Sequence, residues 1–211
     1  MNVNVEREWK AISRTVQSGT RENKPTREVR VGRAFGTNLD DLWDALTNAE
    51  RIRQWMLPIS GDLRLGGTYR LEGNASGTIT ACDPPASFSA TWEYAGEVSW
   101  VEVRLQAISS TETHLELTHI SPVDENMWDQ YGPGATGVGW DLSLLGLSLH
   151  VSSGAPRPPE ADGWESSDEG RRFCRASSDA WAAASVEFGT EPGTARAAAD
   201  RTTAFYTGVS E

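Results

Sequence analysis

The residues of this chain that could perform acid–base or metal chemistry are few and widely spaced. The sequence has three histidines and two cysteines: His114, His119, His150, Cys82 and Cys174. Their spacing fits neither a zinc site nor a disulfide framework. Cys82 has no histidine near it in sequence that could activate a thiol, so we interpret it as a small buried residue. We therefore expect no metal, no cofactor and no identifiable catalytic residue.

One histidine is placed by the hydrophobic alternation on the apolar side of an expected strand. Leu115, Leu117 and His119 alternate with polar residues, which predicts that all three share one face. A hydrogen-bonded core histidine is the simpler interpretation of His119, but in an open cavity it would orient a carbonyl or hydroxyl of a ligand. The glutamates of the expected strands fall on the opposite face unless the register slips by one residue. They are Glu72, Glu102 and Glu116.

The strands that position His119 form an antiparallel meander. Phe88, Ala90 and Trp92 alternate with polar residues, and a two-residue turn at Ala95-Gly96 follows. That turn predicts Trp92 opposite Ser99, Ala90 opposite Val101 and Phe88 opposite Val103, with Trp100 outside. Earlier in the chain, Leu71 is expected opposite Ile79, which would place Tyr69, Leu71, Ile79 and Ala81 on one face. The glycines between Gly61 and Gly77 lack the spacing of a phosphate-binding loop and indicate turns and bulges.

Helices are expected both before and after the meander in the sequence. After a strand over 28–35, Asn38 or Thr37 caps a short helix, and a second short helix runs to Trp55. A long helix covers 138–151, since Trp140, Leu144, Leu147 and Val151 recur at helical spacing. Two further helices follow, the last with Pro192 early and Gly208 as its C-terminal cap. The N-terminal segment predicts a helix around 5–16 and a linker over 19–25.

The charge and hydrophobicity of the chain argue against two classes of protein, general nucleic-acid binders and membrane-spanning proteins. The formal net charge is −11 over 211 residues, which argues against a general nucleic-acid binder. No apolar run reaches the roughly 18 residues that a membrane helix needs. The polar N-terminus does not resemble a signal peptide, and the two cysteines are far apart. We expect a cytoplasmic protein without a membrane span.

The order of the expected elements resembles the helix-grip arrangement of the START-like (SRPBCC) superfamily. Several segments are similar to the branch named after activators of the heat-shock-protein-90 ATPase: Leu42-Trp43-Asp44-Ala45-Leu46-Thr47, 51–55, Gly61-Asp-Leu-Arg-Leu-Gly-Gly, Asp83-Pro-Pro with Trp92, and Gly139-Trp140. This resemblance covers about residues 28–151. The tail, with Arg201-Thr-Thr-Ala-Phe-Tyr-Thr-Gly, is similar to an actinobacterial subgroup with a helical C-terminal extension.

The resemblance implies an α+β, helix-grip (START/Bet v-like) fold. A curved antiparallel sheet would surround the long helix, with extra C-terminal helices. The expected division is a polar N-terminal arm over 1–27, the START-like domain over 28–151, a linker over 152–165, and a helical extension over 166–211 packing on the domain. An apolar cavity between sheet and helix would be lined by these residues: Trp55, Tyr69, Leu71, Phe88, Trp92, Leu117, His119, Trp140 and Leu144.

Fold alone does not determine function, because the superfamily includes binding proteins and enzymes. Our leading hypothesis is a non-enzymatic binder of a small hydrophobic molecule, such as a lipid, an aromatic compound or a polyketide-like metabolite. A cyclase or hydrolase using the same cavity is the alternative, with His119 as its candidate acid–base group. A chaperone-associated or regulatory module that binds a protein partner, or forms a homodimer, is the third hypothesis.

Overall fold

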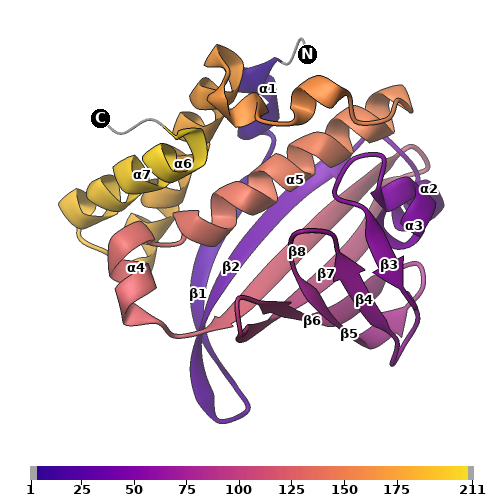
Figure 1. The fold of residues 1–211 in the computed structure, drawn as a ribbon, viewed down its shortest axis with the longest axis horizontal. Helices are drawn as coiled ribbons and strands as arrows, with labels where there is room; N and C mark the ends of the chain where they lie inside the picture. Colours follow the sequence, from indigo (N-terminus) through magenta and orange to yellow (C-terminus); the bar gives the residue numbers. More distant parts are fainter. Residues whose placement is uncertain (1–3, 209–211) are drawn as a thin grey trace. The chain divides into compact units, whose positions relative to one another are not determined.

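The computed structural model describes residues 4–208, and Figure 1 shows the arrangement of its elements. The elements follow in this order: α1 (Val5–Lys10), β1 (Ser13–Arg21), β2 (Lys24–Phe35), α2 (Leu39–Thr47), α3 (Ala49–Ile52), β3 (Ile59–Gly61), β4 (Thr68–Leu71), β5 (Ser76–Asp83), β6 (Ser87–Tyr94), β7 (Glu97–Ser109), β8 (Glu112–Pro122), α4 (Glu125–Tyr131), α5 (Gly134–Ser153), the 3-10 turns η1 (Pro159–Ala161) and η2 (Trp164–Ser166), α6 (Asp168–Phe188) and α7 (Pro192–Thr207). The predicted α+β helix-grip fold is confirmed.

The eight strands form one sheet in the order β1-β2-β8-β7-β6-β5-β4-β3, so β3 to β8 make the predicted six-stranded meander. The β6–β7 register is the predicted one, with Trp92 opposite Ser99 and Phe88 opposite Val103. Ala95 and Gly96 have φ angles of 52° and 87°. Positive φ at both central residues is the geometry of the tight two-residue hairpin turn, which fixes this register.

The register around β5 differs from the prediction. Tyr69 lies opposite Gly77, so Leu71 does not face Ile79. Further along, Ile79 pairs with Ala90 but Ala81 pairs with Ser89, which places one extra residue of β5 between them. A bulge of this kind moves later side chains to the other face, so the expectation for Ala81 was wrong.

The N-terminal segment also differs from the prediction, because β1 takes the end of the expected helix and a hairpin takes the place of the expected linker. The helix α1 ends at Lys10, and β1 and β2 then form a hairpin. Its turn residues Glu22 and Asn23 have positive φ angles of 52° and 62°. The same turn geometry as in β6–β7 occurs here without a glycine, so the sequence lacks the usual signal of a two-residue hairpin turn.

The described residues divide into two compact units. The first unit comprises residues up to Val31, Val123–Leu142 and those from Pro158 onward; the second comprises Gly32–Pro122 and Ser143–Arg157. In the first unit, α6 and α7 pack on the first half of α5, where Gly137 adjoins Trp181 and Gly139 adjoins Tyr206. The domain boundaries expected from the sequence remain a prediction.

Several helix ends are formed by the residues that the sequence indicated. The Asn38 side chain accepts a hydrogen bond from the Asp41 amide at 2.9 Å, and Gly208 caps α7 with a φ of 68°. The helix α4 was not predicted; the side chain of Asp124 caps its first turn. Trp100 lies on the outer face of the sheet, as expected, but it is buried there, opposite Ile120, another buried residue.

Candidate ligand-binding face

One face of the meander in the second unit is apolar. Across β6, β7 and β8, the paired residues of this face are Phe88, Ala90 and Trp92; Ser99, Val101, Val103 and Leu105; and Leu115, Leu117 and His119. We call this set the inner face. All its β7 and β8 members except Ser99 are buried, as the alternating pattern predicted. The face is therefore a hydrophobic wall that contains a single imidazole.

His119 is held in that wall by a neighbouring hydroxyl and a neighbouring ring. Its Nε2 lies 2.8 Å from Oγ of Ser99, and its ring meets that of Trp92 edge-on at 6.0 Å between centroids. The Ser99 hydroxyl donates to the Trp92 carbonyl at 3.1 Å. Because that hydroxyl has only one proton, His119 must donate from Nε2 to Ser99. Burial lowers the pKa of His119 to about 4, so the imidazole is neutral at physiological pH.

Tyr69 and Leu71 extend the wall at β4. They are buried together with Ala90, and Trp92 and Ile79 pack against them. The Tyr69 hydroxyl donates to the Thr91 carbonyl at 2.7 Å. Burial, and secondly the Glu93 carboxylate, raise the pKa of Tyr69, which keeps its hydroxyl protonated.

The helices α2 and α3 lie beside one end of the meander in Figure 1. Trp43 of α2 meets Phe88 edge-on at 6.1 Å between centroids. Trp55, which follows α3, is only 9% exposed, and its Nε1 donates to the Ala45 carbonyl at 2.9 Å. Its backbone also approaches α5, because a Cβ atom added at Gly146 would lie 2.7 Å from the Trp55 carbonyl oxygen. The indole thus joins α2 to the segment after α3.

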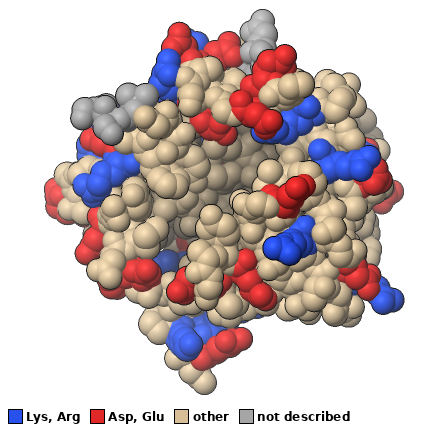
Figure 2. Space-filling model, in the orientation of Figure 1, with Lys and Arg blue, Asp and Glu red and all other residues tan. Residues whose placement is uncertain are grey.

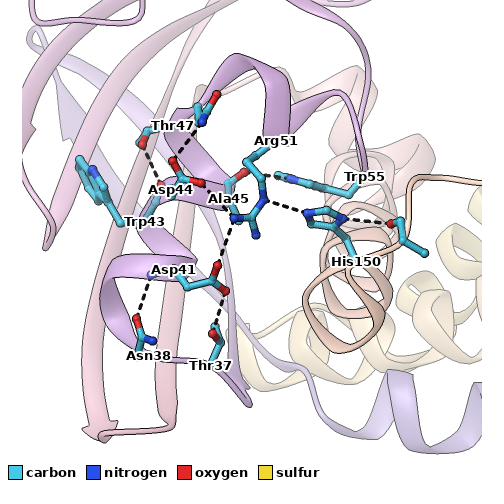
Figure 3. A network of polar contacts seen from close by, with 12 residues as sticks. Thr37, Asn38, Asp41, Trp43, Asp44, Ala45, Thr47, Arg51, Trp55 and His150 are labelled. Carbon is cyan, nitrogen blue, oxygen red and sulfur yellow. Dashed lines mark hydrogen bonds and ion pairs between the residues drawn. The ribbon is translucent and has the colours of Figure 1, made fainter.

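A polar network that the sequence did not reveal lies at the same end of the second unit (Figure 3). The Arg51 guanidinium donates from Nη1 to Asp41 at 3.1 Å and to Asp44 at 3.0 Å, and from Nε to Nε2 of His150 at 3.0 Å. Burial alone would raise the pKa of Asp41, but hydrogen bonds from Thr37 and Arg51, together with the Arg51 charge, hold it below its usual value. The network joins α2, α3 and α5.

Eight of the nine predicted site residues belong to the second unit. The sheet contributes Tyr69, Leu71, Phe88, Trp92, Leu117 and His119; Trp55 follows α3, and the buried Leu144 lies on α5. Trp140, also buried, belongs to the first unit. On the opposite face of the sheet, Glu102 pairs with Thr118 and Glu116 with Arg104, as expected. Glu72 is exposed beyond β4.

Other kinds of site find little support in residues 4–208. No group of three or more histidine, cysteine, aspartate or glutamate side chains there could hold a metal ion. Burial, followed by the charges of Glu165 and Asp141, raises the pKa of the Cys174 thiol to about 12, which makes it a poor nucleophile. None of the described helices combines the length and apolar character needed to cross a membrane. Figure 2 shows acidic and basic residues interspersed over the face drawn.

Comparison with known proteins gives a consistent result. Residues 36–151 match the family described as "Activator of Hsp90 ATPase homolog 1-like protein". The solution structure of CalU16 from Micromonospora echinospora is 31% identical, with a TM-score of 0.69 over 85% of this chain and 97% of that one. PFC0360w, titled an HSP90 activator from Plasmodium falciparum, is 22% identical, with a TM-score of 0.51 over 62% of this chain and 99% of that one. No curated protein matches the chain.

Proposed function

Because the chain belongs to the family of Activator of Hsp90 ATPase homolog 1-like proteins, a branch of the START-like superfamily, we propose that it binds a small hydrophobic molecule without transforming it. The ligand would be a lipid, an aromatic compound or a polyketide-like metabolite, in an apolar cavity against the inner face. The observation that supports this proposal most strongly is the inner face itself, an aliphatic and aromatic wall with one neutral, hydrogen-bonded imidazole.

The protonation of the inner face favours binding over catalysis. General acid–base catalysis is most efficient when the pKa of the group lies near the working pH. The pKa of His119 is displaced downward to about 4, and that of Tyr69 is displaced upward. Both groups are neutral at pH 7, where they can form hydrogen bonds but are poorly matched to proton transfer.

Two aromatic side chains of β6, those of Phe88 and Trp92, give the wall its shape. Phe88 and Trp92 are only partly buried, unlike Ala90 between them. Aromatic rings present a large apolar area at a small cost in conformational entropy, which suits the recognition of a flat or extended apolar ligand. These rings are the contacts that we expect a ligand to use.

The proposal can be tested with the uncharged fluorescent probe N-phenyl-1-naphthylamine. Leu117→Phe adds a ring to a buried position of the inner face, whereas Ile108→Phe adds one at a position on β7 that is 56% exposed. We expect saturable probe binding to wild type and to Ile108→Phe, and binding at least about tenfold weaker to Leu117→Phe, equivalent to about 1.4 kcal/mol. Circular dichroism establishes that each variant is folded.

Equal probe binding by the three proteins would contradict the proposal. A second candidate is a role in binding a protein partner, which the family's description favours. That role predicts retained partner binding by folded Leu117→Phe protein, because the altered side chain is buried. Turnover of a bound compound that is lost in His119→Gln would instead support the enzymatic alternative.

A further inference from the structure

The contact between Arg51 and His150 fixes the protonation state of the imidazole. His150 is 5% exposed, near the end of α5, and both its ring nitrogens have hydrogen-bond partners (Figure 3). Nδ1 lies 3.1 Å from the carbonyl oxygen of Ala155, and Nε2 lies 3.0 Å from Nε of Arg51. A carbonyl can only accept and a guanidinium can only donate. His150 is therefore neutral, with its proton on Nδ1 and a lone pair on Nε2.

A proton added to Nε2 cannot be accommodated in this arrangement. It would remove the acceptor for Arg51 and place an N–H group against an N–H group 3.0 Å away. It would also bring two positive charges together in a largely buried location, where Coulomb repulsion is stronger than in bulk water. One of the two side chains would have to move.

The same contact lies beside two close approaches between the α3 region and the end of α5. The amide of Arg157 donates to the Gln54 carbonyl at 2.6 Å. The backbone of Gly146 adjoins the carbonyl of Trp55, with no room for a side chain between them. We call Arg51, His150 and Ala155 the latch, since they connect α3 to α5 and to the segment after it.

The charges around the latch would stabilise an opened form. Asp41 and Asp44 on α2 both accept hydrogen bonds from Arg51, whose side chain is 28% exposed. Arg157, in the segment after α5, has the same sign of charge as an imidazolium and does not contribute to this stabilisation. The C-terminal end of a helix also favours a cation, here a charged His150. An imidazolium would thus retain favourable surroundings, and Arg51 could remain with the two aspartates while leaving the ring.

We infer that the latch is a proton-sensitive switch, in which uptake of one proton by His150 releases Arg51 and loosens the α3 region from the end of α5. The neutral form holds Gln54 against the segment after α5 and Trp55 against Gly146 of α5, and the charged form frees them. This inference does not depend on the proposed ligand.

Hydrogen exchange followed by NMR tests the inference at the bond concerned. The observable is the protection factor of the Arg157 amide, corrected for the intrinsic effect of pH on exchange. In wild type we expect it to fall on acidification from pH 7.5 to 5.5, by at most about tenfold per pH unit because one proton is bound. The amides of β7 serve as the internal reference for opening of the sheet.

Two variants separate a titrating switch from a structural contact. In His150→Gln, the side-chain oxygen can accept from Arg51 but does not titrate, so the pH dependence should disappear. In Arg51→Gln, an amide replaces the guanidinium and can pair with either form of His150, so the dependence should also disappear. His114→Gln, on β8, is the matched control and should retain the wild-type profile.

The results that would overturn the inference are equally specific. A wild-type protection factor that does not change with pH would contradict it. So would an equal fall in wild type and in either latch variant, because the proton responsible would then bind elsewhere. If one latch variant does not fold, the other gives the decision.

Discussion

The substitution Asp141→Ala is the most stringent test of how the first unit is held together. The Asp141 side chain is fully buried in α5 and accepts from Nε of Arg14 at 2.8 Å, from Nε1 of Trp181 at 3.2 Å, and from the Ser177 hydroxyl. These contacts join α5 to β1 and α6. Burial raises the pKa of the carboxyl, and Arg14, Ser177 and Trp181 oppose that rise.

The expected cost of Asp141→Ala follows from what remains buried. Removing one partner of a buried ion pair costs about 3–5 kcal/mol, because the remaining charge has no compensation. The Arg14 side chain is 6% exposed and would keep its hydrogen bonds to the backbone carbonyls of Ile12 and Trp9. The Ser177 and Trp181 donors also lose their acceptor, at about 1 kcal/mol or more each. Since carbonyls compensate Arg14 in part, we expect its share to be about 2 kcal/mol, below that range, and the total with the two donors to be near 4 kcal/mol.

Urea unfolding followed by circular dichroism measures this cost. With a slope of about 2 kcal/mol per molar, a loss of about 4 kcal/mol lowers the midpoint by about 2 M. The control is Arg64→Ala, which removes a pair with Asp62 whose side chains are 81% and 51% exposed. Exposed pairs of this kind contribute at most about 1 kcal/mol. If Asp141→Ala costs no more than Arg64→Ala, the cluster does not hold the first unit together.

Two further predictions concern His119 and Gly137. The pKa of His119 is about 4 in the folded protein against an ordinary 6.5, so its neutral form stabilises the fold fully above about pH 6.5, and this contribution is lost as the pH falls toward 4. Between pH 7 and pH 5 the free energy of unfolding should therefore fall by about 2 kcal/mol more in wild type than in His119→Gln. Parallel curves of unfolding free energy against pH for the two proteins would contradict this pKa. Alanine at Gly137 would gain about 1 kcal/mol of helix propensity, but its Cβ would lie 2.2 Å from Cε2 of Trp181. We expect a net loss of about 1–3 kcal/mol in urea unfolding. The control Gly36→Ala should change little, because a Cβ added there would meet no atom within 4 Å apart from its chain neighbours. A stabilised Gly137→Ala would show that the packing at this position is loose.

The sequence predicted the parts of the fold that depend on local patterns. Alternation in β6 and β7, together with the Ala95-Gly96 turn, was enough to place Trp92 opposite Ser99. The inner face followed from that register. The bulge after Ile79 could not be inferred in this way, because an extra residue in one strand leaves no distinctive composition.

Contacts between residues far apart in the sequence could not be predicted. Arg14 and Asp141 are separated by 127 positions, and Arg51 and His150 by 99. Each residue alone resembles an ordinary surface charge or a helix-terminal histidine. Only the packing of β1 and α6 on α5, and of α3 near the end of α5, gives these side chains their partners.

Methyl NMR spectra give the most direct test of the proposed ligand-binding face. Protein with labelled leucine, valine and isoleucine methyl groups would be titrated with N-phenyl-1-naphthylamine. We predict the largest shifts at Leu117 and Val103 of the inner face, and small shifts at Val98 and Ile108, which are 44% and 56% exposed. Shifts concentrated at Val98 and Ile108, or no saturable shift at all, would contradict a ligand-binding inner face.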